Sequence, residues 1–347
     1  MKKGNLTGTY YFIVHVCVEM ICFYVLRRHY SFVVSGTIAL LYDFVAFMPQ
    51  GLIGDFIIKH KKIPYETIGH LLMLLSVFLV LSDLSWVYYT GFIALGIGNA
   101  ILHECGAIAT VAESEGKIFP SALFVSGGSF GLVIGETLGT LQVTPLILIL
   151  PFVVSEVCAL LAKESVRRES YPVFRCVKGT ISLGWILGVA FLVTAVRSYL
   201  AYAIPISWKK EIWQSFLLFF VMGFGKALGG YFADRVGLRK TATFATLAAI
   251  PFLVLGDNAM VLSVIGVCFF SMTMCITFAM CLSVLPRNPG MAFGVTTAAL
   301  FLGLMPLGFG RFGLLTNAIL ITVFSVICAV LLLMTLKERE KPEDGRL

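Results

Sequence analysis

Apolar residues dominate almost the whole chain, in stretches of about 20 residues separated by short polar segments. A helix of that length crosses the hydrocarbon core of a bilayer. The pattern predicts twelve membrane-spanning helices, of which the third and the ninth are short. The predicted helices cover residues 7–26, 32–57, 66–82, 87–110, 120–141, 144–163, 180–203, 212–232, 241–256, 259–284, 290–308 and 313–336.

The longest polar stretch, residues 164–179, falls close to the middle of the chain. It predicts a boundary between two groups of six helices. We therefore expect an all-α polytopic membrane protein. Its parts would be an N-terminal six-helix bundle at residues 1–163, a cytoplasmic linker at 164–179, and a C-terminal six-helix bundle with a short tail at 180–347.

The composition agrees with a membrane protein and excludes an ordinary soluble domain. Of the 347 residues, 59% are hydrophobic and only 13% are charged, whereas soluble proteins have about 25% charged residues. The nine cysteines are scattered without a CxxC pair, so we expect small buried side chains rather than a metal or redox site. Phosphate-binding loops, hydrolase motifs and zinc spacings are absent from the sequence, which predicts neither an enzyme nor a bound cofactor or metal.

The basic residues predict the orientation. With twelve spans both termini lie on one side, and most of the 26 lysines and arginines fall in the loops of that side. Such an excess marks the cytoplasmic side of a membrane protein. We expect a monomer in the plasma membrane with both termini in the cytoplasm, in contact with lipid. The net charge of +7 then reflects topology and does not indicate nucleic-acid binding.

Two charged segments repeat at equivalent places in the two halves. The segments "QGLIGDFIIKHKK" at 50–62 and "GGYFADRVGLRK" at 229–240 both follow the second helix of a half. Asp55 and Asp234 each stand four residues after a glycine, Gly51 and Gly230. Duplicated six-helix halves are typical of transporters that work by rocking one half against the other.

A second repeat opens the fifth helix of each half. The segments that begin at Pro120 and Pro289 carry Phe124 and Phe293 at matching offsets. This repeat supports the duplication independently of the charged segments.

The later charged segment resembles motif A of the major facilitator superfamily, G-x-L-A-D-R-x-G-R-K. The matching residues are Gly230, Asp234, Arg235, Gly237, Arg239 and Lys240. The earlier segment keeps Gly51, Asp55 and Lys59 but lacks the arginine and glycine after the aspartate. The resemblance implies two six-helix bundles and transport by alternating access. It also implies that these residues form gate contacts between the halves.

The motif has a simple physical interpretation. Small residues let the second predicted helix approach the eleventh, and the eighth approach the fifth. The aspartate then faces the N-terminus of the neighbouring helix, where free N–H groups and the helix dipole favour negative charge. We expect these contacts to hold the cytoplasmic side closed. The alternative is that the basic residues only fix the topology.

A narrower resemblance covers residues 96–139. The segment is similar to helices 4 and 5 of the fosmidomycin-resistance-like branch of efflux proteins, and carries Gly96, Gly98, Ala100, His103 and Glu104 at the matching positions. In this sequence the glutamate directly follows the histidine, where that branch often has a proline.

The fifth predicted helix carries glycines at every fourth position. They are Gly127, Gly131, Gly135 and Gly139. This spacing makes a flat stripe for close helix packing. It resembles the antiporter motif G-x-x-x-G-P, with Glu136 in place of the proline.

Nine ionisable residues inside the predicted spans are candidates for a function. Each charge at the membrane centre costs at least ~2.5–3.5 kcal/mol, so such residues are expected to face a cavity or a partner. They are His15, Glu19, Asp43, His103, Glu104, Glu136, Glu156, Arg197 and Lys226. Among them Glu19, Asp43 and Glu136 are candidates for binding a proton or a substrate cation.

The roles of the others are expected from their positions. His15 and Glu19 share one helix face, and Glu19 could instead pair with His15 or the arginines at the helix end. Arg197 is expected to face Glu19 across a cavity, to bind an anionic substrate, or to reach the outer interface. Lys226 is assigned to the gate. For His103 and Glu104, a proton relay and a structural hydrogen bond remain open.

Together these features predict a secondary transporter that is coupled to protons and moves a small organic solute by alternating access, with efflux by antiport preferred. The first alternative is uptake or exchange of an anionic metabolite, with Arg197 as its ligand. The second is a membrane sensor or partner protein without transport activity.

Overall fold

The computed structural model describes residues 2–28, 35–305 and 312–338. Every regular element in these ranges is a helix, apart from one isolated bridge between Val177 and Leu336. The helices are α1 (Lys3–Arg28), α2 (Ser35–Phe47), α3 (Gln50–Lys59), α4 (Tyr65–Leu79), α5 (Ser85–Ala112), α6 (Phe119–Thr140), η1 (Pro145–Leu148), α7 (Ile149–Val166), α8 (Leu183–Ala203), α9 (Ile212–Val236), α10 (Leu238–Leu255), α11 (Met260–Ser271), α12 (Met274–Val284), α13 (Pro289–Leu304) and α14 (Leu314–Thr335).

The predicted all-α fold with twelve spans is confirmed. Ten helical stretches are long and apolar enough to cross a membrane, and two shorter apolar helices, α4 and α13, complete the set. Two predicted spans are interrupted, between α2 and α3 and between α11 and α12, and a third begins with the short 3-10 helix η1, which continues directly into α7. The break after α2 falls at Pro49, which lacks an N–H donor and so disrupts the helix. The predicted limits at residues 32 and 308 lie outside the described residues.

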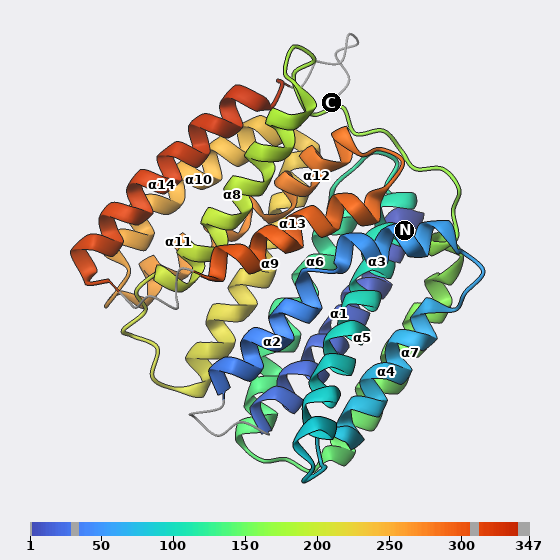
Figure 1. Cartoon of the computed structure of the whole chain (residues 1–347). Coiled ribbons are helices and arrows are strands. Elements are labelled where there is room, and N and C mark those ends of the chain that lie inside the picture. The colour runs from blue at the N-terminus through green and yellow to red at the C-terminus, as the bar shows by residue number, and fades with distance from the viewer. Residues whose placement is uncertain (1, 29–34, 306–311, 339–347) are drawn as a thin grey trace.

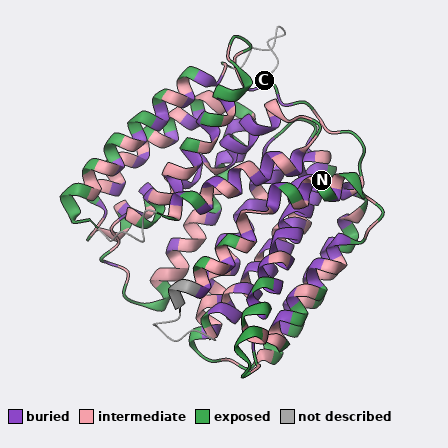
Figure 2. Cartoon of the chain, in the orientation of Figure 1, coloured by how far each residue is buried: buried purple, intermediate pink, exposed green. Residues whose placement is uncertain are grey.

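Helices α1 to α7 gather on one side of the molecule and α8, α10, α11 and α14 on the other (Figure 1). The segment between α7 and α8, residues 167–182, passes from one group to the other. The groups touch where α6 packs against α9 and where α3 packs against α13. Buried residues concentrate along these contacts, and exposed ones follow the outer helices (Figure 2). Large apolar side chains on the outside, such as Trp86 (70% exposed) and Leu315 (75% exposed), suit a lipid-facing surface.

The glycine stripe of α6 lies against α1. A Cβ added at Gly131 would overlap the carbonyl oxygen of Val16, and one added at Gly135 would overlap that of Met20. Gly127 meets α1 one turn earlier, at Phe12. The four-residue spacing on α6 therefore matches a four-residue spacing on α1, and only glycine allows the two backbones to come this close.

A small ion-pair network ties three segments together at the end of α5. Glu113 lies 3.1 Å from the Nζ of Lys3 and 3.0 Å from the Nε of Arg168. Burial alone would raise the pKa of Glu113, but the hydrogen bonds from Arg168 and Lys3 outweigh it and hold this pKa below its ordinary value. The network joins the N-terminus, the end of α5 and the segment after α7.

We expect Glu113→Gln to lower the free energy of unfolding at neutral pH by about 1 kcal/mol, because both cations are half-exposed and screened by solvent. The folded-state pKa is depressed, so this contribution is complete above the ordinary carboxyl pKa and is lost as the pH falls through the folded value. Thermal unfolding in detergent at neutral and at acidic pH should show the two proteins converging in acid. An equal gap at both pH values would contradict the assignment.

Candidate functional site

A cavity of about 220 Å³ lies between the two groups of helices and is lined by both. Next to it lies a vestibule of about 780 Å³. Five residues line both spaces, namely Phe23, Leu132, Tyr202, Phe219 and Met222. The vestibule lies among the C-terminal ends of α1, α6 and α8, so we call this the open side. The opposite side, where α3 and α9 end, is called the gate side.

Two histidines from different helices meet in the cavity wall. His15 on α1 and His103 on α5 approach through their Nε2 atoms, which are 2.7 Å apart. The Nδ1 of His15 lies 2.9 Å from the carbonyl oxygen of Phe124, and that of His103 lies 3.0 Å from the carbonyl oxygen of Asn99. Both rings are buried.

This geometry fixes the number of protons. A carbonyl oxygen only accepts, so each Nδ1 must carry a hydrogen that it donates. In a neutral imidazole the other nitrogen then bears a lone pair. Two lone pairs facing each other at 2.7 Å would repel, whereas one proton between them makes an N–H···N hydrogen bond. The pair of His15 and His103 is therefore built to hold one additional proton.

Glu19 supplies the negative charge for this proton. Its Oε1 lies 3.4 Å from the Nε2 of His103 and 3.7 Å from the Nε2 of His15. The Nδ2 of Asn99 donates to the same oxygen at 3.0 Å and also reaches the hydroxyl of Tyr42 at 2.9 Å. The protonated pair and the carboxylate are neutral as a group, which lowers the cost of burying them. We call His15, Glu19 and His103 the His–Glu cluster.

The same three residues also have the composition of a metal site. They offer three ligand atoms within 4.8 Å of one another. Two histidine nitrogens bound to tetrahedral zinc at ~2.0–2.1 Å would stand about 3.3 Å apart, which is wider than the 2.7 Å found here. The spacing fits a shared proton and does not fit an ion.

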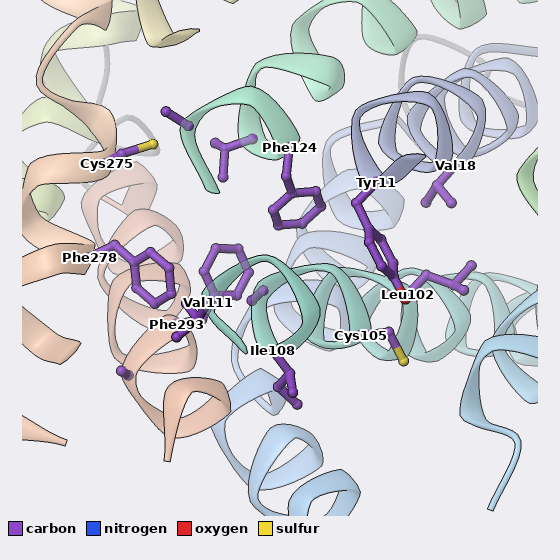
Figure 3. Close-up of a cluster of buried hydrophobic side chains, with 14 of the residues drawn as sticks. Tyr11, Val18, Leu102, Cys105, Ile108, Val111, Phe124, Cys275, Phe278 and Phe293 are labelled. Atoms are coloured by element: carbon purple, nitrogen blue, oxygen red, sulfur yellow. The ribbon is translucent and has the colours of Figure 1, made fainter. Parts of the chain in front are cut away.

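An aromatic layer closes the cavity on the gate side. The ring of Phe124 on α6 lies 5.9 Å from that of Phe293 on α13, and Phe293 lies 5.3 Å from Phe278 on α12. Figure 3 shows these three rings next to one another. The two phenylalanines at matching offsets in the repeated segments thus meet across the boundary between the halves. Phe124 also packs against His15, with ring centroids 5.0 Å apart.

The motif A residues lie on the gate side, beyond the aromatic layer. Asp234 at the end of α9 accepts hydrogen bonds from the backbone nitrogens of Ile118 (2.8 Å) and Phe119 (2.9 Å), at the start of α6. Asp55 on α3 instead accepts from the side chain of Asn288 at 2.8 Å and from Lys59 at 2.6 Å. The more complete copy thus contacts a helix N-terminus directly, and the degraded copy contacts one through the residue that caps it.

The motif glycines lie where helices from the two halves cross. A Cβ added at Gly230 would overlap the side chain of Ala122 on α6. Gly51 on α3 lies against Gly294 on α13, where a Cβ added at Gly294 would overlap the backbone of Gly51. Gly237 has a φ of +97°, which favours glycine, and it separates α9 from α10.

The remaining motif residues are basic. The guanidinium of Arg235 stacks 4.3 Å from the ring centroid of Tyr231. Arg239 pairs with Glu338 at 3.0 Å. Lys240 is exposed on the same surface.

Arg197 does not occupy the place predicted for it. It is buried among the helices of the C-terminal half, where its Nη2 donates to the carbonyl of Phe270 at 3.0 Å and its guanidinium lies 5.0 Å from the Phe270 ring. It lines a separate space of only about 10 Å³. The expectation that Arg197 faces Glu19 is therefore wrong, because α8 turns this side chain into its own half.

Lys226 takes the cavity position instead. It precedes Asp234 on α9 by eight positions, which corresponds to about 12 Å along the helix. Its side chain consequently lines the central cavity together with the His–Glu cluster, and its Nζ donates to the hydroxyl of Ser129 at 2.8 Å. The assignment of Lys226 to the gate is corrected by this placement.

The other predicted acids are spread over three places. Asp43 on α2 lines the central cavity, and Glu136 on α6 lines only the vestibule. Glu104 is fully buried where α3 crosses α13, and neither of its carboxyl oxygens has a hydrogen-bond partner. Glu156 lies 2.7 Å from His70, within the N-terminal half. Of these acids only Asp43 joins the His–Glu cluster at the cavity.

No protein-family model and no curated protein matches the sequence. Solved structures match over nearly the full length. A variant of the Escherichia coli fucose:proton symporter FucP aligns with a TM-score of 0.62 at 12% identity, covering 95% of this chain and 97% of that one. A FucP structure in the outward conformation aligns with a TM-score of 0.61 at 15% identity, with the same coverage of 95% and 97%.

The human organic anion transporter MFSD10 aligns with a TM-score of 0.59 at 14% identity, covering 96% of this chain and all (100%) of that one. At these identities the likeness concerns the fold. The narrower resemblance to the fosmidomycin-resistance-like branch stays a prediction. The twelve-span architecture, the contacts of Asp55 and Asp234 between the halves and these matches agree on one conclusion: the chain has the fold of the major facilitator superfamily of transporters.

Proposed function

We propose that this protein is a secondary transporter that couples the movement of a small organic solute to protons. The observation that carries the proposal is the His–Glu cluster, in which two histidines with carbonyl-bound Nδ1 atoms face each other at 2.7 Å in a cavity between the halves. Proton coupling needs a proton-binding site next to a solute-binding site. The buried cluster supplies the first, and the adjoining cavity is large enough for a small solute.

The two groups of helices, residues 1–163 and 180–347, are the moving bodies in this proposal. The gate contacts of Asp55 and Asp234 hold the gate side closed while the cavity adjoins the vestibule. We place the gate side and both termini in the cytoplasm, because the basic loops lie there. The present state then faces outward with its proton bound, in a monomer in the plasma membrane.

The direction of coupling depends on how solute and proton affect each other. A cationic solute that took the place of the proton at Glu19 would give antiport, the efflux mode predicted from the sequence. A solute that strengthened proton binding would give transport of both in one direction.

Purified protein in liposomes with an internal pH dye tests the proposal. Organic cations, anions and neutral compounds are added one at a time, with wild type, Glu19→Gln and the vestibule variant Glu136→Gln as a matched control. We expect at least one compound class to move protons through wild type and Glu136→Gln, and none to do so through Glu19→Gln. Unchanged proton movement in Glu19→Gln, or none with any class in wild type, would refute the proposal.

A further inference from the structure

Lys226 is the cationic group of the cavity that has no acidic partner. Within the described part of the chain, its Nζ donates one hydrogen bond, to the neutral hydroxyl of Ser129. Among the described residues, no carboxylate lies within 4.0 Å of its Nζ. A lysine held in a largely apolar cavity without a counterion is expected to bind an anion that comes from outside the chain.

The charges around Lys226 favour an anion at this position. The other titratable groups that line the cavity are His15, Glu19, Tyr42, Asp43, His103, Tyr202 and Cys275. The protonated His15–His103 pair and Glu19 balance each other, so they do not neutralise Lys226. Asp43 belongs to α2 and makes no ion pair within the described ranges.

The rest of the cavity wall is apolar and largely aromatic. Its main side chains are Phe47, Phe219, Met222, Met274, Phe278 and Phe293. Such walls bind the body of an organic molecule and leave a few polar groups to set its orientation. The volume of about 220 Å³ suits a compact ring with a short side chain.

We propose that the substrate is an organic monoanion with an apolar, ring-sized body, and that Lys226 binds its acidic head group. This inference rests on the proposed transport function and names the substrate class of the same cavity. Lys226 thus fills the role of anion ligand that was expected of Arg197 from the sequence.

The proposal also sets the direction of coupling. An anion at Lys226 offsets the positive charge of the lysine, which otherwise opposes a proton on the nearby histidine pair. Anion and proton therefore strengthen each other's binding, and by linkage the effect is mutual. This favours movement of both in the same direction over the antiport predicted from the sequence.

The test uses purified full-length protein and four probes that share one aromatic body: phenylacetate, phenethylamine, phenylacetamide and phenylalanine. Binding is measured by calorimetry for wild type, Lys226→Gln, Lys226→Arg and the control Lys210→Gln, which removes an exposed lysine. Thermal unfolding of each variant checks that it is folded. We expect phenylacetate to bind wild type at least about tenfold more tightly than the amine, the amide or the zwitterion, a difference of ~1.4 kcal/mol.

Lys226→Gln should weaken phenylacetate binding by at least about tenfold, whereas Lys226→Arg and Lys210→Gln should retain it. The proposal is overturned if phenylacetate does not bind wild type, if Lys226→Gln binds it equally well, or if the amine, amide or zwitterion binds as tightly. Proton uptake during binding, measured at a pH at which the histidine pair of the free protein is not fully protonated, separates the two proposals. Phenylacetate binding without proton uptake would refute proton coupling but leave the anion site standing. Proton movement driven only by cationic solutes would refute the anion site but leave proton coupling standing.

Discussion

His103→Ala is expected to abolish solute-coupled proton movement, down to the level of empty liposomes. Without the second imidazole, the Nε2 of His15 loses the partner with which it shares a proton at 2.7 Å. Glu19 loses its nearer imidazole, at 3.4 Å, and must then remain charged in the cavity with weaker compensation or become protonated itself. In either case the site that couples proton movement to solute movement is lost.

The measurement is the liposome assay, with His60→Ala as the matched control. His60 is an exposed histidine beyond the end of α3, so its removal should leave coupling unchanged. Counterflow of the solute at equal pH on both sides reports whether the variant still binds and moves solute. Full proton movement in His103→Ala would show that the histidine pair is not the coupling site.

Gly131→Val is expected to eliminate folded protein. The added side chain would enter the space held by the backbone of α1 at Val16, where no rotamer change can make room. Helices α1 and α6 would have to separate, and the contacts of His15 with Phe124 would be lost with them. The expected effect exceeds the 1–3 kcal/mol of ordinary overpacking, because rigid backbone is displaced.

Gly188→Val on α8 is the control for this prediction. A Cβ at Gly188 meets nothing within 4 Å, so valine there should be tolerated in a membrane helix. Expression and size-exclusion profiles in detergent distinguish the two variants. A monodisperse Gly131→Val protein with wild-type thermal unfolding would contradict the described packing of α1 on α6.

The sequence predicts the helices well, since a span is defined by its own length and apolarity. The break at Pro49 has a local signal, whereas the one between Ser271 and Met274 has none. The repeated segments also predict which helices of the two halves meet. The contacts of Gly230 with α6 and of Gly51 with α13 follow from small residues at fixed spacing.

The candidate site was only partly predictable. All three members of the His–Glu cluster are apparent from the sequence, because ionisable residues are rare in membrane spans. The pairing of His15 with His103 depends on how α1 crosses α5, and the roles of Arg197 and Lys226 depend on the rotation of α8 and α9. A helix turns by about 100° per residue, so a small error in rotation moves a side chain from the cavity into its own bundle.

The proposed coupling depends on one proton that is shared between His15 and His103. The most direct test is nitrogen NMR of protein labelled at its histidines, with His15 and His103 assigned by comparison with His15→Ala and His103→Ala. We predict that both Nδ1 atoms carry a hydrogen and that a single additional proton correlates with both Nε2 atoms. A bare Nδ1 on either ring, or no proton shared between the two Nε2 atoms, would show that the pair does not hold the coupling proton.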